Sequence, residues 1–220
     1  MQLLKSLPHY IRIFIQVYIK QNIDTFITYL KAFYWGVSIG KGATFVGIPK
    51  FRRPPGSIIS IGKETRILSS FASNLHGLNR KSMITALTKN AHIKIGNNVG
   101  MSGVIIASAK SITIGDRVMI GANTTISDTD SHAINYQYRH PSYYGFTSKD
   151  FKEPIKTKEI IIEEDVFIGM NSLILKGAHI GKGSVIGAGS IVTGCIPPNV
   201  IAAGQPAKVI KEVEVLEEQN

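Results

Sequence analysis

The sequence predicts a mainly β protein, a solenoid of short parallel strands with a helical segment before it and one long loop excursion. The first observation is a set of aliphatic residues at an unbroken period of six: Ile162, Ile168, Ile174, Ile180, Ile186 and Val192. The second is that all 21 glycines lie within residues 36–210, several of them directly after such an aliphatic residue. The third is a long interruption of the repeat between Ile126 and Ile162.

A period of six matches neither common secondary structure. A helix places apolar residues every 3.6 positions on one face, and a half-buried strand places them at every second position. A short strand followed by a turn, repeated, has a period of six, and three such units make one triangular coil. Ile162 and Ile180 are then equivalent positions of neighbouring coils. Their stacking supplies a core that no single coil forms, and the glycines permit tight corners where a Cβ would clash.

Residues 1–35 precede the repeat and are predicted to be helical. Asp24 is expected to cap the start of a second helix that extends to Phe33. The main expectation is that both helices pack on the rest of the protein. The alternative is a basic, aromatic helix that rests on a membrane surface. Apolar residues at helical spacing are Tyr10, Phe14, Val17 and Tyr18, and the cations are Lys5, Arg12, Lys20 and Lys31.

The solenoid is predicted to span residues 36–210. Its repeat is strong in 162–197, good in 95–131 and weak before residue 95. The loop excursion is placed at 132–160, and such a loop on one face of a solenoid is commonly a binding loop. Residues 211–220 are charged and are expected to form a tail, as a short helix or a frayed end.

The chain of 220 residues has a net charge of +10 that is unevenly spread. Residues 1–110 hold 15 Lys/Arg and 2 Asp/Glu, whereas residues 111–220 hold 10 Lys/Arg and 13 Asp/Glu. The basic half indicates an anionic partner, either nucleic acid, a membrane surface or an acidic or phosphorylated substrate. Nucleic acid is disfavoured, because the basic residues lack the aromatic interleaving of a nucleic-acid-binding module.

The number of cysteines and the length of the apolar stretches exclude several other kinds of site and segment. Cys195 is the single cysteine, so an intramolecular disulfide and a CxxC metal site are excluded. The longest charge-free stretch near the start, residues 13–19, is far shorter than the roughly 20 residues of a membrane span. No secretory signal is expected, since no small-residue cleavage site follows residues 1–20.

His132 is the first candidate for catalysis, because it stands where the regular repeat gives way to the loop. A neutral imidazole there can take a proton from a hydroxyl as that hydroxyl attacks a thioester. A nearby carboxylate can orient the ring and stabilise the imidazolium that forms. Asp130 is the preferred orienting residue and Asp128 its rival, and both could instead be turn formers.

The segment 127–132, together with residues 162–210, resembles the acetyl-CoA-dependent hexapeptide-repeat O-acetyltransferases. Within that family it resembles the galactoside and maltose acetyltransferases and the enzymes that acetylate bacterial surface polysaccharides. The resemblance implies a left-handed parallel β-helix, a homotrimer with sites between subunits, and His132 as the general base. It also implies contacts to acetyl-CoA, which map to Phe167 near the thioester and to Met170, Ala188, Thr193 and Lys208.

The sequence departs from the galactoside branch around the acceptor. The Asn and Asp of that branch correspond to places near Ser102 and Ala109, and Gly194 replaces a basic residue after Thr193. The acceptor site is therefore expected to differ, with Asp128, Ser102 and His140 as the candidate contacts. No histidines lie at the spacing of the metal-binding members of this fold, so no catalytic metal is expected.

The expected function is transfer of acetyl from acetyl-CoA to a hydroxyl of a sugar, in a capsular or O-antigen polysaccharide or its precursor. One alternative is acetylation of an amino sugar nitrogen, of serine or of an antibiotic. Another is a solenoid that serves as a scaffold or surface-binding module without catalysis. The expected location is the cytoplasm, where residues 1–35 could contact the inner face of the membrane.

Overall fold

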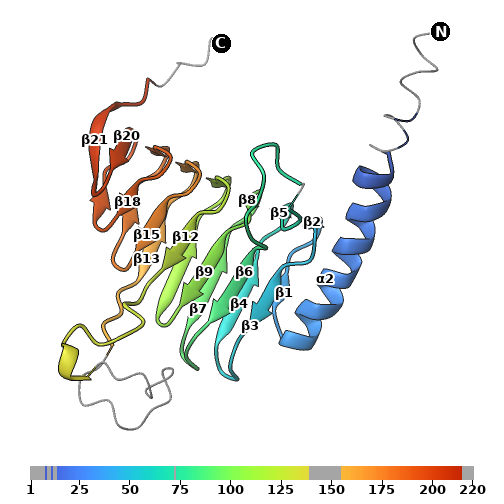
Figure 1. The fold of residues 1–220 in the computed structure, drawn as a ribbon, viewed down its shortest axis with the longest axis horizontal. Helices are drawn as coiled ribbons and strands as arrows, with labels where there is room; N and C mark the ends of the chain where they lie inside the picture. The colour runs from blue at the N-terminus through green and yellow to red at the C-terminus, as the bar shows by residue number, and fades with distance from the viewer. Residues whose placement is uncertain (1–7, 9–10, 12–13, 72, 139–154, 215–220) are drawn as a thin grey trace.

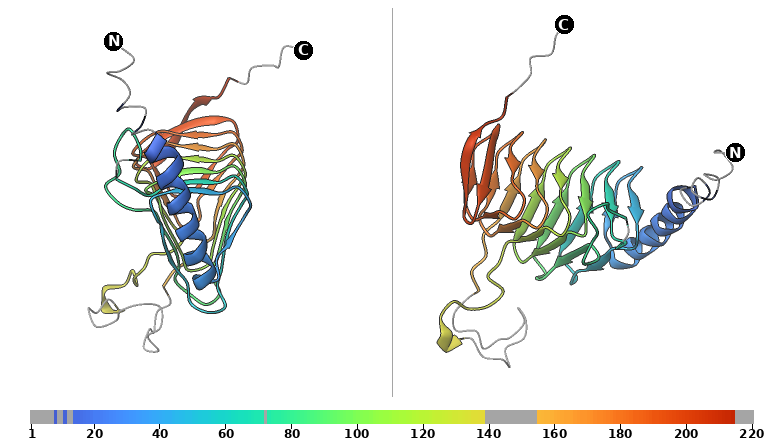
Figure 2. Two further views of the ribbon diagram at one scale, coloured as in Figure 1. Left: turned by 90° about the vertical axis from the view of Figure 1, so that its right-hand side faces the viewer. Right: turned by 45° about the horizontal axis from the view of Figure 1, so that its top comes forward.

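The computed structural model describes residues 8, 11, 14–71, 73–138 and 155–214. These form a triangular solenoid of parallel strands, and a helical rod lies across its N-terminal end (Figure 1). The end-on view in Figure 2 shows this rod passing over the first coil. Within the described part, no helix is long and apolar enough to cross a bilayer.

The helical rod consists of the π-helix η1 (Ile15–Lys20), which continues directly into α2 (Gln21–Trp35). The expectation that Asp24 caps a separate second helix is wrong, because Asp24 lies in the first turn of α2. Its carboxylate instead accepts a hydrogen bond from the Gly47 backbone N–H at 2.7 Å, which ties the helix to the first coil. Gly36 ends α2 in the left-handed conformation, with φ of 63°.

Three parallel sheets form the faces of the prism. Sheet A contains β1 (Ser38–Ile39), β4 (Ile58–Ile61), β7 (His92–Ile95), β10 (Ser111–Ile114), β13 (Ile160–Ile162), β16 (His179–Ile180) and β19 (Cys195–Ile196). Sheet B contains β2 (Thr44–Val46), β5 (Arg66–Leu68), β8 (Gly100–Ser102), β11 (Met119–Ile120), β14 (Phe167–Ile168), β17 (Val185–Ile186), β20 (Val200–Gly204) and β21 (Ala207–Glu212). Sheet C contains β3 (Lys50–Arg52), β6 (Met83–Ala86), β9 (Ile105–Ser108), β12 (Thr125–Ser127), β15 (Leu173–Leu175) and β18 (Ile191–Val192). The chain visits A, B and C in turn, so each circuit is one coil.

The predicted period of six is confirmed by the core. Each aliphatic residue of the repeat points into the prism and is paired in register with its equivalent one coil away. In sheet A this gives one continuous column: Ile39, Ile61, Ile95, Ile114, Ile162, Ile180 and Ile196. Burial of each such side chain contributes about 1.5–3 kcal/mol, so stacked columns hold the coils together.

The corners explain the glycines and the small polar residues. A Cβ on Gly169 would lie 2.4 Å from the Ala188 backbone nitrogen, because neighbouring coils approach closely there. The buried hydroxyl of Ser172 closes the same corner by donating to the Gly169 carbonyl at 2.8 Å. Close approach between coils, rather than a left-handed backbone, therefore requires glycine at position 169.

The C-terminal end differs from the expectation of a helix or frayed tail. The last strand, β21, turns back and pairs antiparallel with β20. Lys211 and Glu212 belong to this strand, and Val213 still donates its N–H to the Asn199 carbonyl at 2.8 Å. Residues 215–220 lie outside the described part.

Two excursions leave the solenoid. The predicted one departs after β12 and returns at β13, and its described portion includes the short 3-10 helix η2 (Tyr136–Tyr138), drawn in yellow in Figure 1. The second lies between β5 and β6, has residues 69–71 and 73–82 as its described part, and was not predicted. It is fixed by Arg80, whose guanidinium donates to the Gly103 and Asn123 carbonyls and to Thr125 Oγ1. Burial lowers the pKa of Arg80 from its ordinary value.

Candidate active site

The base of the 132–160 excursion is a short antiparallel pairing at the corner between sheets C and A. Thr129 bridges Thr157, the Asp130 N–H donates to the Lys156 carbonyl at 3.1 Å, and the Lys158 N–H donates to the Asp128 carbonyl at 3.0 Å. This pairing holds the chain that enters the loop against the chain that leaves it. The segment that carries His132 therefore starts from a fixed point.

Asp128 is fully buried at this base, and its carboxylate is saturated with hydrogen bonds. It accepts from Ser108 Oγ at 2.7 Å and from the backbone N–H groups of Ala109, Lys110 and Ser111 at 2.6, 2.9 and 2.7 Å. This geometry contradicts the expectation that Asp128 contacts substrate, because neither carboxylate oxygen is accessible. Asp128 instead links the loop base to the preceding corner of the solenoid through these hydrogen bonds.

Asp130 has a more open environment. Its Oδ1 forms an ion pair with Lys176 Nζ at 2.7 Å, and the side chain is 22% exposed. Its Oδ2 is buried and has no hydrogen-bond partner among the described residues. Leaving a buried carboxylate oxygen without a hydrogen bond costs free energy. A donor that reached this atom would therefore be stabilised there.

His132 is exposed and follows directly on a strained turn. Ser131 adopts the left-handed conformation with φ of 62°, which is uncommon for residues other than glycine, asparagine and aspartate. On the other side, Ala133 is buried with 3% exposure and anchors the chain. Among the described residues the His132 ring has no hydrogen bond or ion pair. The imidazole is therefore presented to solvent from a fixed backbone, and the expected contact with Asp130 is not formed here.

Phe167 lies on the outer face of sheet B, 48% exposed, in a pocket of about 290 Å³. Ser102 lines the same pocket and accepts a hydrogen bond from Asn74 Nδ2 at 3.1 Å. Two predicted site residues are thus brought together, and Asn74 joins them from the second excursion. Sequence reasoning missed Asn74 because the repeat is too weak before residue 95 to reveal where the chain leaves the coil.

The other predicted contacts to acetyl-CoA fall on the last coils. Met170 and Ala188 occupy successive corners between sheets B and C, where the Gly189 N–H donates to the Met170 carbonyl at 2.8 Å. Thr193 is exposed at the corner between sheets C and A, the corner from which the excursion also departs. Lys208 is exposed on β21 opposite Ala203.

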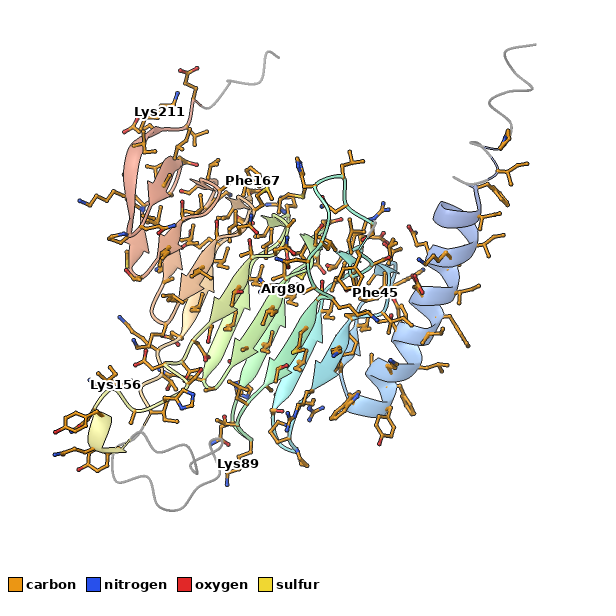
Figure 3. All side chains as sticks on the ribbon, viewed as in Figure 1. Phe45, Arg80, Lys89, Lys156, Phe167 and Lys211 are labelled. Atoms are coloured by element: carbon orange, nitrogen blue, oxygen red, sulfur yellow. The ribbon has the colours of Figure 1, made fainter. Side chains whose placement is uncertain are left out.

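Within one chain the predicted site residues do not come together, and those nearest the proposed chemistry lie on different sides of the prism. His132, Asp130 and Thr193 lie at the corner between sheets C and A, whereas Phe167 and Ser102 lie on sheet B. Figure 3 shows Phe167 at the opposite edge of the solenoid from Lys156, which belongs to the loop base. His140 lies outside the described residues. Nor does any group of three or more His, Cys, Asp or Glu side chains in the described part come together as a metal site.

An exposed charge network crosses the coils away from these groups. Arg117 pairs with Asp165 at 2.6 Å and with Glu164 at 3.0 Å, and Lys182 pairs with Glu164 at 2.7 Å. The Arg117 hydrogen bonds hold the pKa of Asp165 below its ordinary value, and Lys182 followed by Arg117 does the same for Glu164. His179 is in hydrogen-bond contact with Glu163 at 2.7 Å, which gives it a structural partner.

Comparison with known proteins agrees with the repeat and with the fold. Residues 111–127 and 159–194 match the family model described as the hexapeptide repeat of succinyl-transferase. Galactoside O-acetyltransferase of Escherichia coli (strain K12) is 40% identical over 125 residues, which are 56% of this chain and 55% of that protein. The chain spans about half or less of the length of the curated relatives it matches.

Two solved structures share the architecture at low sequence identity. An N-acyltransferase, AntD of Bacillus cereus, in complex with dTDP-4-amino-4,6-dideoxyglucose and coenzyme A, has a TM-score of 0.63 and 20% identity, with 85% of this chain and 90% of that chain covered. A hexapeptide-repeat acetyltransferase of Vibrio cholerae O1 biovar eltor, complexed with acetyl coenzyme A, has a TM-score of 0.51 and 23% identity, covering 97% and 89%. These likenesses establish the fold as the left-handed parallel β-helix, and the sequence resembles the hexapeptide-repeat acetyltransferases.

Proposed function

We propose that this hexapeptide-repeat β-helix protein transfers an acetyl group from acetyl-CoA to a hydroxyl of a sugar, in a surface polysaccharide or its precursor. The observation that carries the proposal is the exposed imidazole of His132, presented from a fixed turn where the excursion leaves the coil. Support comes from the similarity to galactoside O-acetyltransferase. The loop also sits on the solenoid where binding loops commonly lie.

His132 acts as the general base in this proposal. Its neutral ring takes the proton of the acceptor hydroxyl while the hydroxyl oxygen attacks the thioester carbonyl. Collapse of the tetrahedral intermediate breaks the carbon–sulfur bond, and the imidazolium returns the proton to the departing thiolate. The products are an acetyl ester and the free thiol of coenzyme A, so atoms and charge balance without a metal.

Asp130 is proposed to position the ring. Its Oδ2 is buried and has no partner among the described residues, and a ring N–H of His132 would supply one after a side-chain rotation. Lys176 already holds Oδ1 at 2.7 Å and fixes the carboxylate in place. The acceptor contacts are assigned to Ser102 and His140, as the sequence suggested.

Acetyl-CoA is proposed to bind along the late coils, with Phe167 near the thioester and Met170, Ala188, Thr193 and Lys208 along the rest of the molecule. Phe167 lies on sheet B and His132 follows β12 of sheet C, so in one chain they belong to different sides of the prism. We therefore propose that a complete site takes Phe167 from one subunit and His132 from a neighbour. A homotrimer places the site between subunits. Its assembly would also explain why the single chain holds two half-sites.

The proposal is tested by replacing His132 with Ala and measuring release of coenzyme A thiol from acetyl-CoA in the presence of sugar acceptors. Loss of a general base should lower the rate by about 100- to 10,000-fold. His179→Ala is the matched control, because that ring is partly exposed on β16 of sheet A and is bonded to Glu163 at 2.7 Å. Equal rates for the wild type and His132→Ala would refute the proposed role.

A second candidate function is acetylation of an amino sugar nitrogen. It is favoured by the fold shared with an N-acyltransferase that was crystallised with an amino sugar nucleotide. An acceptor screen that pairs each sugar with its amino analogue separates the two. Faster turnover of the amino sugars would favour nitrogen, and turnover of the hydroxyl compounds alone would favour oxygen. Absence of heat on titration with coenzyme A would instead favour a non-catalytic scaffold.

A further inference from the structure

The outer face of the helical rod is apolar, although the rod covers one end of the solenoid. Its inner seam, Asp24, Thr28 and Ala32, is buried against the first coil. On the opposite side an exposed stripe follows helical spacing: Ile19 (46% exposed), Ile23 (53%), Phe26 (65%), Leu30 (55%) and Phe33 (88%). The cap of a soluble solenoid has a polar outer face, so this helix stripe needs an apolar partner.

The positive charge of this half of the chain favours one kind of partner for the helix stripe. Lys20 and Lys31 accompany it, and the acidic residue of α2, Asp24, is buried and committed to Gly47. Two copies that met through this face would bring together two halves that each carry 15 Lys/Arg against 2 Asp/Glu. An anionic lipid surface satisfies both the apolar stripe and the positive charge.

A groove of about 870 Å³ lies beside the rod, between the end of α2 and the outer face of sheet C. Its floor is apolar and includes Ile48, Pro49, Met83, Leu87 and Ile105. Four cations line it (Lys31, Lys50, Arg52 and Lys81), and none of its described lining residues is acidic. An apolar floor with a cationic lining suits a ligand that joins a hydrocarbon chain to an anion.

Thr85 gives an independent sign of a ligand in this groove. The residue lines the groove and is only 8% exposed, yet its Oγ1 is buried without a hydrogen-bond partner among the described residues. An unpaired buried hydroxyl costs about 1–3 kcal/mol. A ligand oxygen in the groove would supply the missing partner.

The groove leads toward the candidate catalytic loop. Along the outer face of sheet C, Arg52 pairs in register with Thr85, Thr85 with Ala107, and Ala107 with Ser127. Strands are about 4.8 Å apart, so the three steps of this row span roughly 14 Å, which leaves room for a phosphate and a sugar. Ser127 is the last residue of β12, and the chain continues from there to His132. The small side chains of Thr85, Ala107 and Ser127 leave space for rings above the row.

We propose that the acceptor is a sugar phosphate carried on a membrane lipid. The helix stripe rests on the anionic bilayer, the groove binds the phosphate and the adjoining part of the hydrocarbon chain, and the sugar extends along sheet C to His132. Trp35 and Tyr34, which line the groove and pack edge to face, lie at the proposed interface, where aromatic side chains are favoured. This inference rests on the proposed function for the acetylation of the sugar, whereas binding of the lipid requires no catalysis.

Occupancy of the groove can be read directly, because Trp35 lines it and is the single tryptophan of the chain. Farnesyl phosphate below its micelle concentration should change the Trp35 emission saturably. Farnesol and inorganic phosphate, tested at the same concentrations, should bind at least about tenfold more weakly. No change with farnesyl phosphate, or equal binding of either fragment alone, would overturn the assignment to an anionic lipid.

Variants of the groove sharpen this test. Arg52→Gln combined with Lys81→Gln should weaken farnesyl phosphate binding by about tenfold, whereas Lys94→Gln, an exposed cation on sheet A, should leave it unchanged. Thr85→Val should weaken binding while the melting temperature holds or rises, because it removes the unpaired hydroxyl. Equal weakening by Lys94→Gln, or unchanged affinity in Thr85→Val, would show that binding is not specific to the groove.

Cosedimentation with vesicles tests the helix stripe. The wild-type protein should pellet with vesicles of phosphatidylcholine and phosphatidylglycerol and much less with phosphatidylcholine alone. Phe26→Ser combined with Phe33→Ser should abolish pelleting, whereas Phe71→Ser, an exposed aromatic on the second excursion, should retain it. If the double variant instead shrinks an oligomer and the wild type ignores the vesicles, the stripe joins two copies and the proposal fails. Neither binding assay needs acetyl transfer, so failure of the His132 test would leave both results interpretable.

Discussion

Asp128 and Asp130 lie two residues apart, yet their surroundings give them different tasks. Asp128 is buried and accepts four hydrogen bonds from the preceding corner. Asp130 is partly exposed, and one of its oxygens has no partner in the part of the chain that the structure describes. The sequence offered both as orienting residues for His132. Only the fold distinguishes them, because it decides which carboxylate meets the backbone N–H groups of residues 109–111.

Asp128→Asn should therefore destabilise the protein by about 3 kcal/mol, since an amide nitrogen would face donors that now meet a carboxylate. Urea unfolding followed by circular dichroism measures the change. Glu159→Gln is the control, because it makes the same charge change at an exposed position of the loop base. A variant with unchanged stability and lost acetyl transfer would return Asp128 to the reaction.

The proposal of His132 as the general base comes from its place in the repeat, where the coil gives way to the loop. Its orientation could not be predicted, because the left-handed turn at Ser131 and the anchor at Ala133 arise from packing around the loop base. Asn74 was missed for a related reason. It approaches Ser102 only because the second excursion folds back on sheet B.

At the scale of elements, the strength of the repeat decided what the sequence could predict. Residues 162–192 place an aliphatic residue inward in every unit, and each one is buried in a stacked column. Before residue 95 the spacing is irregular, because the chain leaves the coil between β5 and β6. The role of Asp24 was misjudged because a capping residue and a tertiary contact look alike in sequence: its carboxylate meets Gly47, not the start of a helix.

The ion pairs of Arg117 and Lys182 with two carboxylates on neighbouring coils predict that the stability of the fold depends on pH in the acidic range. The pKa values of Asp165 and Glu164 are held below their ordinary values by Arg117 and Lys182, so the folded state binds fewer protons than the unfolded state. Their contribution is complete above the ordinary carboxyl pKa of about 4 and is lost as the pH falls through the lowered values. Both carboxylates are exposed, so the effect is small and sensitive to salt.

Arg117→Gln should therefore flatten the fall of the melting temperature as the pH is lowered from about 5 to about 3. Near neutral pH, the loss of these exposed ion pairs should change stability little. Differential scanning calorimetry across this range compares the two proteins, with Lys89→Gln as a control that removes an exposed cation outside the network. Parallel curves for the wild type and Arg117→Gln would show that the network contributes nothing to acid stability.

At the scale of the whole molecule, the separation of Phe167 from His132 predicts complementation between subunits. Phe167→Ala and His132→Ala should each be poorly active alone. When the two are co-expressed, an interface that takes Phe167 from one subunit and His132 from the other contains an intact site, because the two residues lie on different sides of one chain's prism. Activity of the mixed sample should exceed both parents, and a sample no more active than its parents would place the whole site within one chain.

In this three-sided solenoid, distance along the axis is a whole number of equal steps. Each circuit advances the chain by one strand spacing, about 4.8 Å, and every circuit contacts only its neighbours. The number of circuits between the rod, the groove and the loop that carries His132 therefore sets the distances between them. Deleting or duplicating one circuit between β3 and β12 would shift the loop by a single step. Such a change would select acceptors of a different length while leaving every side chain at either end in place.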